Sequence, residues 1–330
     1  MRMRAEADYW AGYRFRPRLI ATTRGAAWVM EDHLPLLVRI DSATGEVGKP
    51  RRVTGKDSGD RGAHELVSGA GALWVRWNDG VTRVDAVDGS ERWLPLSAAS
   101  LAAGDAGVWA LAGDGRVVRI DPTGGDYVTL GDAEVRRHTI AVGHGAAWTL
   151  TWTSVPAGST LSRIDAASGR VSAHVSLEGS PRKLLVDSHA IWVRLWRHSA
   201  GEPVQEVLVR VDPRKAEPVG EIVVSPPAAG GPVLEGVLWA SDVDPYAREE
   251  RGTPSAVRRI DARTGHLLGA VQTPGSVTGM TAGRCGVWGV LERAEEPDAL
   301  IELSSDGLTA RVINLAALDI SEFVPSGRSR

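Results

Sequence analysis

Short apolar runs centred on a tryptophan recur along the chain, and each follows a glycine-rich turn. The seven central residues, 35 to 49 positions apart, are Trp28, Trp74, Trp109, Trp148, Trp192, Trp239 and Trp288. No segment shows the 3.6-residue apolar period of an amphipathic helix, and the apolar runs have the length of strands. A repeat of this length indicates one supersecondary unit that is copied along the chain.

The fourth copy shows how one repeat divides into strands. We expect four strands at residues 139–143, 146–152, 161–165 and 170–177. Gly145 and Gly169 take the left-handed backbone conformation that ends a hairpin turn. Four antiparallel strands repeated seven times predict an all-β fold, a seven-bladed β-propeller of four-stranded antiparallel blades. In such a ring the seven tryptophans act as apolar wedges between blades.

A second motif, Arg-Ile-Asp or Arg-Val-Asp, ends the third expected strand of six repeats. It occupies residues 39–41, 83–85, 119–121, 163–165, 210–212 and 259–261. Because a catalytic group does not occur six times, we interpret the pair as a recurrent salt bridge or a brace for the turn that follows. The seventh repeat lacks the arginine, and Ile301 is expected in its place.

Residues 1–17 precede the first repeat, and residues 18–330 are expected to form a single propeller domain. Tyr9, Trp10, Tyr13 and Phe15 give this leader an aromatic character. It either adds an edge strand that closes the ring or folds over one mouth of the central channel.

Composition restricts the class of protein. The 330 residues are 43% hydrophobic with a net charge of −3, so we expect a sizeable core and no binding to nucleic acid. The single cysteine, Cys285, excludes an internal disulfide. No stretch reaches the roughly 20 apolar residues of a membrane span, and the N-terminus lacks the apolar run of a signal peptide. We therefore expect a cytoplasmic monomer that does not bind membranes.

The repeats differ most in the connection between their second and third strands. It is long in three repeats, at residues 153–160, 197–206 and 242–255. All such connections leave the same face of a propeller, so they build a rim over about half of that face. A half-walled mouth of this kind is the expected position of a site for a small molecule or peptide.

Polar side chains at the starts of the innermost strands are expected to ring this mouth. They are Arg18, His64, Glu65, His138, Arg182 and Lys183. Histidine transfers protons near neutral pH, so His64 and His138 are candidate catalytic residues with Glu65, and the cations suit a developing negative charge. Polar groups also line propeller mouths for solvation alone. A metal site at His64, Glu65 and His138 has no tight ligand spacing to support it.

Five residues depart from the repeat in or just after the second strands. Trp77, Trp152 and Trp196 follow the central tryptophans by three or four positions, where exposed aromatic rings suit a ligand or a partner. Arg76 and Arg194 place a charge at a position that is apolar in other copies. Each is therefore paired with an acid or meets an anionic ligand.

The first strand of the sixth repeat also departs from the pattern. Residues 226–232 carry proline, alanine and glycine where other copies carry leucine or isoleucine. The missing side chains either leave room for a ligand or mark an irregular strand that the prolines break.

The cadence Gly-Ala-[Ala/Leu]-Trp-Val, Val-x-Arg-Ile-Asp and then a Thr-Gly or Ser-Gly turn resembles bacterial propellers of the YVTN and streptogramin-lyase-like kind, over about residues 18–314. In the virginiamycin B lyase branch, a propeller opens a cyclic depsipeptide by elimination, with His and Glu side chains and a magnesium ion. That branch carries a glutamate three residues after the tryptophan, and here Glu31 matches, with Asp242 as a shorter carboxylate. The resemblance implies a related enzyme on another substrate, with magnesium as a cofactor and these two residues at its site.

Two functions follow. The first is a lyase-, isomerase- or cyclase-type enzyme that moves a proton of a small molecule or peptide, with His64 or His138 as the base. Its site lies on the face of the long connections. The second is a non-catalytic propeller, a ligand sensor or protein-interaction scaffold whose tryptophan-rich rim docks its partner.

Overall fold

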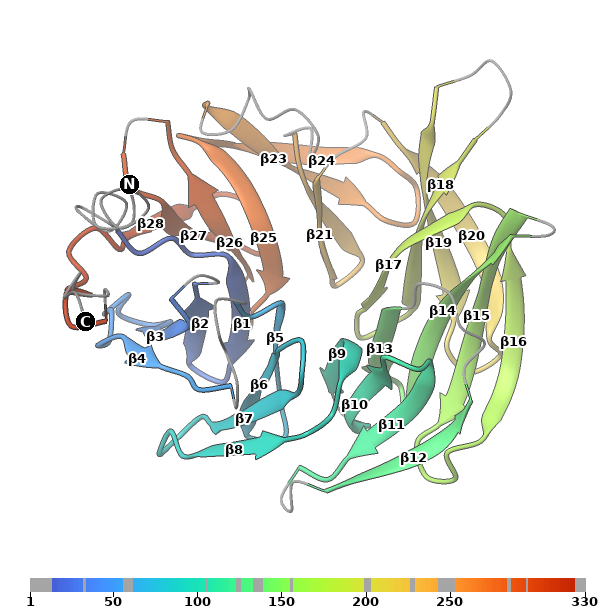
Figure 1. Cartoon of the computed structure of the whole chain (residues 1–330). Helices are drawn as coiled ribbons and strands as arrows, with labels where there is room; N and C mark the ends of the chain where they lie inside the picture. Colours follow the sequence, from blue (N-terminus) through green and yellow to red (C-terminus); the bar gives the residue numbers. More distant parts are fainter. Residues whose placement is uncertain are drawn as a thin grey trace, which may run out of the picture.

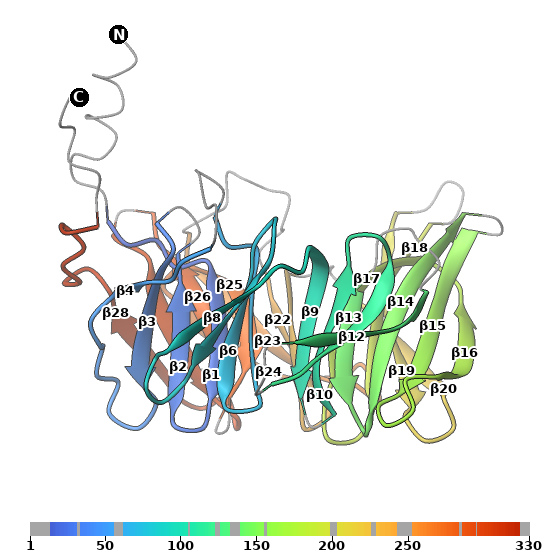
Figure 2. The same ribbon diagram turned by 60° about the horizontal axis from the view of Figure 1, so that its bottom comes forward.

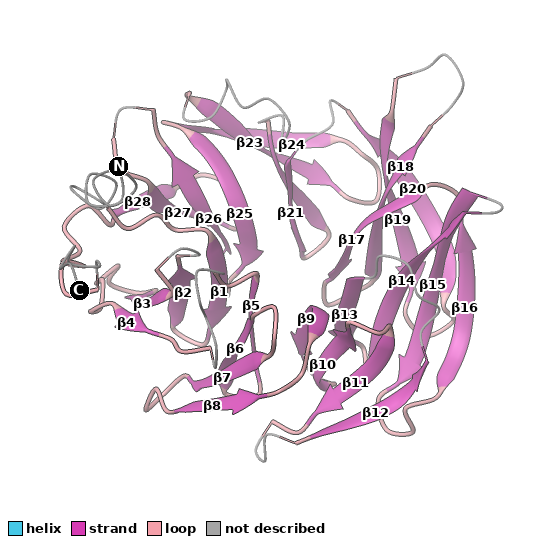
Figure 3. Ribbon diagram, in the orientation of Figure 1, coloured by secondary structure: helices cyan, strands magenta, loops and turns pink. Residues whose placement is uncertain are grey.

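The computed structural model describes residues 14–31, 34–55, 62–104, 106–122, 126–132, 139–154, 157–198, 203–225, 229–242, 253–283, 286–294 and 296–323. His138 and Cys285 lie outside these ranges. The described chain consists of strands, turns and loops (Figure 3). Within it there is no helix with the length and apolarity needed to traverse a membrane. The strands form seven separate four-stranded antiparallel sheets, which confirms the predicted all-β propeller.

Each sheet is a blade made from one continuous stretch of chain. Blade 1 contains β1 (Leu19–Thr23), β2 (Ala26–Met30), β3 (Leu36–Asp41) and β4 (Arg51–Arg52). Blade 2 contains β5 (Glu65–Gly69), β6 (Ala72–Arg76), β7 (Val81–Asp85) and β8 (Glu91–Leu94). Blade 3 contains β9 (Ala98–Gly104), β10 (Gly107–Ala112), β11 (Arg116–Ile120) and β12 (Tyr127–Asp132). Blade 4 contains β13 (Thr139–Gly143), β14 (Ala146–Ser154), β15 (Ala157–Asp165) and β16 (Val171–Leu177).

The last three blades continue the same order. Blade 5 contains β17 (Ser180–Val186), β18 (Ile191–Arg197), β19 (Gln205–Asp212) and β20 (Glu217–Val224). Blade 6 contains β21 (Ala229–Leu234), β22 (Val237–Ser241), β23 (Ser255–Asp261) and β24 (Leu267–Thr273). Blade 7 contains β25 (Ser276–Ala282), β26 (Gly286–Glu292), β27 (Ala299–Ser304) and β28 (Ala310–Asn314).

The blades form a ring in which the first strand of each blade lies innermost (Figure 1). Each innermost strand neighbours that of the next blade, and β25 neighbours β1. Figure 2 shows the blades side by side, with tight turns such as that between β13 and β14 on one face and connections such as that between β14 and β15 on the other. We call these the turn face and the loop face.

Within the described residues blades 1 and 7 share no strand, and side chains join them. The Thr22 hydroxyl donates to the Ala282 carbonyl at 2.6 Å, and Arg311 of β28 donates to the Ser42 carbonyl at 2.6 Å. Residues 14–17 form no strand, and Phe15 packs with Ile320 in the apolar cluster between the two blades. The rest of the leader lies outside the described residues.

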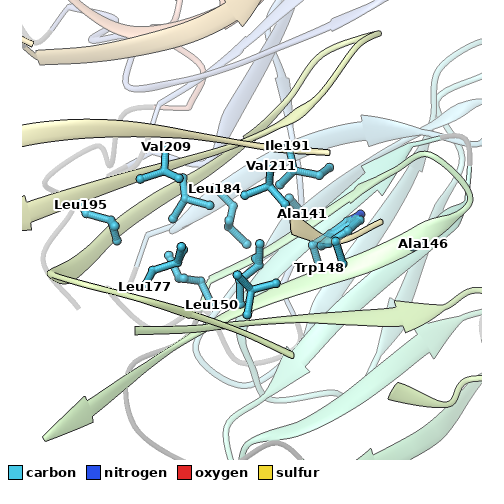
Figure 4. Packing of buried hydrophobic residues seen from close by; sticks show 14 of the residues in the cluster. Ala141, Ala146, Trp148, Leu150, Leu177, Leu184, Ile191, Leu195, Val209 and Val211 are labelled. Atoms are coloured by element: carbon cyan, nitrogen blue, oxygen red, sulfur yellow. The ribbon is translucent and has the colours of Figure 1, made fainter. Parts of the chain in front are cut away.

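The central tryptophans pack between blades, as predicted. Each lies in a cluster that also contains apolar side chains of the following blade. Figure 4 shows the cluster between blades 4 and 5, where Trp148 is fully buried with Leu150, Leu184, Ile191, Val209 and Val211. Replacing a buried tryptophan by alanine costs about 3–5 kcal/mol, so these wedges are a main source of stability.

The Arg-x-Asp motif braces turns as expected, and in three repeats its arginine also bonds to the next blade. The Asp165 carboxylate accepts the Ser168 backbone N–H at 2.8 Å, which holds the turn after the strand. A salt bridge within the motif forms at Arg83 and Asp85, 3.1 Å apart. Arg119 instead donates to the Ala166 carbonyl of the next blade at 2.7 Å. The motif therefore joins neighbouring blades as well as closing its own turn.

Blade 7 corrects one prediction. Glu302, not Ile301, faces Trp288 across the sheet, as Arg39 faces Trp28 in blade 1. The position expected for the motif arginine is wrong by one residue. The turn that follows the third strand of blade 7 starts at Ser304 and is one residue shorter than the corresponding turn of blade 1. Arg311 of β28 supplies the missing guanidinium: it lies 2.5 Å from Glu302 and 6.0 Å from the centre of the Trp288 ring.

The connection in blade 4 corrects another prediction. Residues 153–160 were expected to be a loop, but β14 and β15 pair as far as Ser154 and Ala157. Threonine is abundant in this stretch, and β-branched residues favour strands. The extended hairpin and the neighbouring end of β18 give the loop face a wall of regular structure at blades 4 and 5.

Candidate functional site

A cavity of about 400 Å³ opens on the loop face between blades 4 and 5. It is lined by Thr139, Trp152, Ser180, Pro181, Arg182, Trp196 and His198. A volume of this size suits a small organic molecule. The structure therefore brings three of the predicted ligand-binding residues together in one place: Trp152, Trp196 and Arg182.

The ends of three strands position these side chains. Trp152 lies near the end of β14 and is 37% exposed. Trp196 lies near the end of β18, His198 directly follows the strand, and both line the cavity. Arg182 occupies a bulge in β17, and its guanidinium carbon lies 3.8 Å from the centre of the Trp196 ring.

The lining combines groups with complementary chemistry. Two indole rings offer apolar faces for a flat or hydrophobic part of a ligand. The Arg182 guanidinium lies over the Trp196 ring, and a guanidinium in this position can bind a carboxylate. His198 adds an imidazole, a side-chain type that serves as a general acid or base. The sequence interpretation missed His198, although its spacing from Trp196 on one strand was a usable signal.

Beside this cavity, Lys183 faces the central channel. Burial lowers the pKa of its ammonium group, the charge of Arg194 lowers it further, and Glu65 of blade 2 raises it. The Lys183 side chain is exposed to solvent, although protein atoms surround it closely enough to lower this pKa. The charge of Glu65 on blade 2 thus acts on Lys183 of blade 5.

Glu65 is held firmly on the other side of the channel. Its carboxylate accepts the Leu101 backbone N–H of blade 3 at 2.8 Å and lies 3.1 Å from Nε of Arg76. Burial raises the pKa of the Glu65 carboxyl, and these hydrogen bonds offset part of that rise. Of the two readings of Arg76, the structure therefore shows pairing with an acid.

Arg194 is likewise paired. It forms an ion pair with Glu206 of β19, and both side chains are buried. A Cβ atom at Gly230 of blade 6 would overlap the Arg194 guanidinium. The sequence left open whether the small residues of blade 6 make room for a ligand. At Gly230 the Arg194 guanidinium fills that room.

The remaining predicted residues lie apart from the cavity. Trp77 was expected to be exposed, but it is buried in the core. Its Nε1 donates to the Thr82 hydroxyl at 2.9 Å. Glu31, which the family resemblance implies at the site, is fully buried. Asp242 forms an ion pair with Arg258 at the start of the blade 6 connection.

The polar residues expected to ring the mouth do not all line this cavity. Arg18 and His64 are exposed at the starts of β1 and β5, and neither lines the cavity between blades 4 and 5. His138 lies outside the described residues. No three His, Cys, Asp or Glu side chains gather into a metal-binding group in the described ranges. The Glu65 carboxylate, which is engaged by Leu101 and Arg76, does not fit the magnesium that the family resemblance implies.

Comparison with known proteins supports the fold. No protein-family model and no curated protein matches the chain. It is similar to the Pan2 WD40 domain of Neurospora crassa, with 12% identity, a TM-score of 0.58 and 87% of each chain covered. It is also similar to hydrazine synthase of Kuenenia stuttgartiensis, with 14% identity, a TM-score of 0.59, and 92% of this chain and 95% of that chain covered.

A further similar structure is the dihydro-heme d1 dehydrogenase NirN, with 12% identity, a TM-score of 0.55, and 94% of this chain and 69% of that chain covered. Identities this low establish a shared propeller fold and nothing about chemistry. The neighbours include enzymes as well as a WD40 domain, so the fold leaves both kinds of function open.

Proposed function

We propose that the protein is an enzyme that holds a small carboxylate-bearing molecule in the cavity between blades 4 and 5 and moves a proton on it. The observation that carries this proposal is the convergence of Trp152, Trp196, Arg182 and His198 from two blades on one cavity of about 400 Å³. Packing alone does not explain it, because Trp152 and His198 are exposed.

Each side chain has a role in this proposal. The two indoles hold the apolar part of the substrate, and Arg182 binds its carboxylate or the negative charge that develops as the proton leaves. His198 accepts the proton from carbon and returns it to the product or to the leaving group. The reaction class is therefore elimination, isomerisation or cyclisation, as for the lyase-like propellers that the sequence resembles.

A deuterium-exchange experiment tests the proposal. The protein is incubated in heavy water with a panel of aromatic and aliphatic carboxylates, and NMR follows loss of carbon-bound hydrogen. Binding is followed separately through quenching of tryptophan fluorescence. We expect His198→Gln to bind the responsive compound and to lose about 100-fold or more in exchange rate. Arg182→Gln should lose about 10-fold or more in affinity.

His189→Gln is the matched control, because His189 lies in the same blade on the turn face. It should keep the exchange rate of the parent protein. An exchange rate that is equal in His198→Gln and the parent would exclude His198 as the base.

The alternative function is a ligand sensor or interaction scaffold without catalysis. The stacking of Arg182 on Trp196 favours it, since an exposed aromatic and cationic surface is typical of recognition sites. Binding without exchange in the parent protein, weakened equally by Arg182→Gln and Trp196→Leu, would support this alternative over the enzyme.

A further inference from the structure

A second cavity, of about 1050 Å³, opens on the turn face between blades 1 and 2. Its walls come from the turn after β1, from β3 and from the turns of blade 2. Two arginines, Arg24 and Arg39, line it, and its remaining walls are small or hydroxyl-bearing residues. Neither the proposed enzyme site nor the repeat motif accounts for this cavity.

Comparison with the other blades shows why the cavity is open. In three of the six repeats the motif arginine donates to the turn of the next blade: Arg83 to the Pro122 carbonyl at 3.0 Å, Arg119 to the Ala166 carbonyl at 2.7 Å, and Arg259 to the Asp306 carbonyl. The corresponding carbonyl for Arg39 belongs to Ala86, which instead lies in the cavity wall. Arg39 contacts Asp41 at 3.5 Å, and its side chain is 47% exposed.

The cavity therefore presents hydrogen-bond donors that the fold does not use. Within the described residues, Arg24 has no hydrogen-bond or ion-pair partner, and Arg39 has only its long contact with Asp41. The Thr23 hydroxyl accepts a hydrogen bond from Trp28 Nε1 at 2.9 Å, which leaves its proton free to donate. The Asp41 carboxylate is already occupied by the Ala43 and Thr44 backbone N–H groups, each at 3.0 Å.

We propose that this cavity is a binding site for the phosphoryl group of a small molecule. Two guanidinium groups complement the negative charge of a phosphate and can donate to its oxygens, and the Thr23 hydroxyl adds a neutral donor. The organic part of the ligand lies along Ala86 and the exposed side chain of Val87. The site is separate from the cavity on the loop face, so neither proposal depends on the other.

Calorimetric titration with inorganic pyrophosphate tests the site. We expect binding that weakens as salt is added, because the site is open to solvent. Arg24→Gln and Arg39→Gln should each lower the affinity about 10-fold or more. Neither arginine belongs to a buried network, so both variants should fold as the parent protein does.

Arg263→Gln is the matched control, since it removes one exposed charge from a turn of blade 6 on the same face. It should leave the affinity unchanged. Three results would overturn the proposal: no heat of binding in the parent protein, equal weakening by all three variants, or tighter binding of succinate than of pyrophosphate. Loss of pyrophosphate binding in Arg182→Gln alone would assign the anion to the loop face instead.

Discussion

The buried ion pair of blade 5 provides the sharpest test of the structure. Glu206 is 3% exposed and Arg194 is 7% exposed, and they bond to each other between β18 and β19. Glu206→Gln keeps the size of the side chain and removes its charge. The buried positive charge of Arg194 then loses the carboxylate that pairs with it, which costs about 3–5 kcal/mol.

This cost converts into a change in melting temperature. An entropy of unfolding of about 2.1 cal/mol/K per residue gives roughly 0.7 kcal/mol/K for a chain of this length. One kcal/mol therefore corresponds to about 1.4 °C, and Glu206→Gln should lower the Tm by about 4–7 °C. Differential scanning calorimetry at neutral pH measures the shift.

A second ion pair in the same blade is the control. Arg197 contacts both carboxylate oxygens of Glu221 at 2.7 Å, but the Glu221 side chain is 48% exposed. Exposed pairs contribute about 0–1 kcal/mol, so Glu221→Gln should change the Tm by about 1 °C or less. The double variant Arg194→Met/Glu206→Leu should recover most of the loss, because no charge stays buried.

Two outcomes would refute this reasoning. If Glu206→Gln and Glu221→Gln lower the Tm equally, burial does not set the strength of the pair. If the double variant is less stable than Glu206→Gln, the fold needs the charges themselves.

Three further predictions use the same calorimetry or fluorescence titration. Gly145→Ala adds a methyl group at a φ of +69°, and no other atom lies within 4 Å of it, so backbone strain alone should lower the free energy of unfolding by about 1 kcal/mol. Gly220 is equally free of neighbours and has no positive φ, so Gly220→Ala should cost no stability. Because burial lowers the pKa of Lys183, the folded state binds fewer protons than the unfolded state between the two pKa values, and stability rises with pH there. Lys183→Met should therefore raise the Tm at neutral pH, and this gain should vanish above the ordinary lysine pKa of 10.5; a gain that is independent of pH would contradict the assignment. Trp77→Phe should lower stability by about 1–3 kcal/mol through its lost hydrogen bond and leave ligand affinity intact, whereas Trp196→Leu should lower ligand affinity; a fall in affinity with Trp77→Phe would count against the buried position.

The repeat made the fold predictable from sequence. Period, tryptophan spacing and turn glycines are local properties, and each copy confirms the others. Gly145 and Gly169 do adopt positive φ values of 69° and 68°, as their places in the turns required. The errors fell where a copy departs from the pattern. A missing residue in the turn shifted the assignment at Ile301, and the strands of blade 4 continued through an expected loop.

The candidate site was predictable only in part, because it depends on contacts between copies. The sequence identified Trp152, Trp196 and Arg182 as unusual, but the same criterion also selected Trp77, which is buried. An aromatic residue that departs from the repeated pattern can face the core or the solvent, depending on which strand covers it. Only the tertiary structure contains that information.

The number of blades, their strand order and the wedge positions can be derived from the amino-acid pattern, since they follow from backbone and burial preferences repeated along the chain. The tertiary structure decided which charges pair, as in Arg194 with Glu206, and which remain at a surface, as in Arg24 and Arg39. Ion pairs and cavities depend on side chains brought together across blade boundaries, and distances across those boundaries are fixed only when the ring closes.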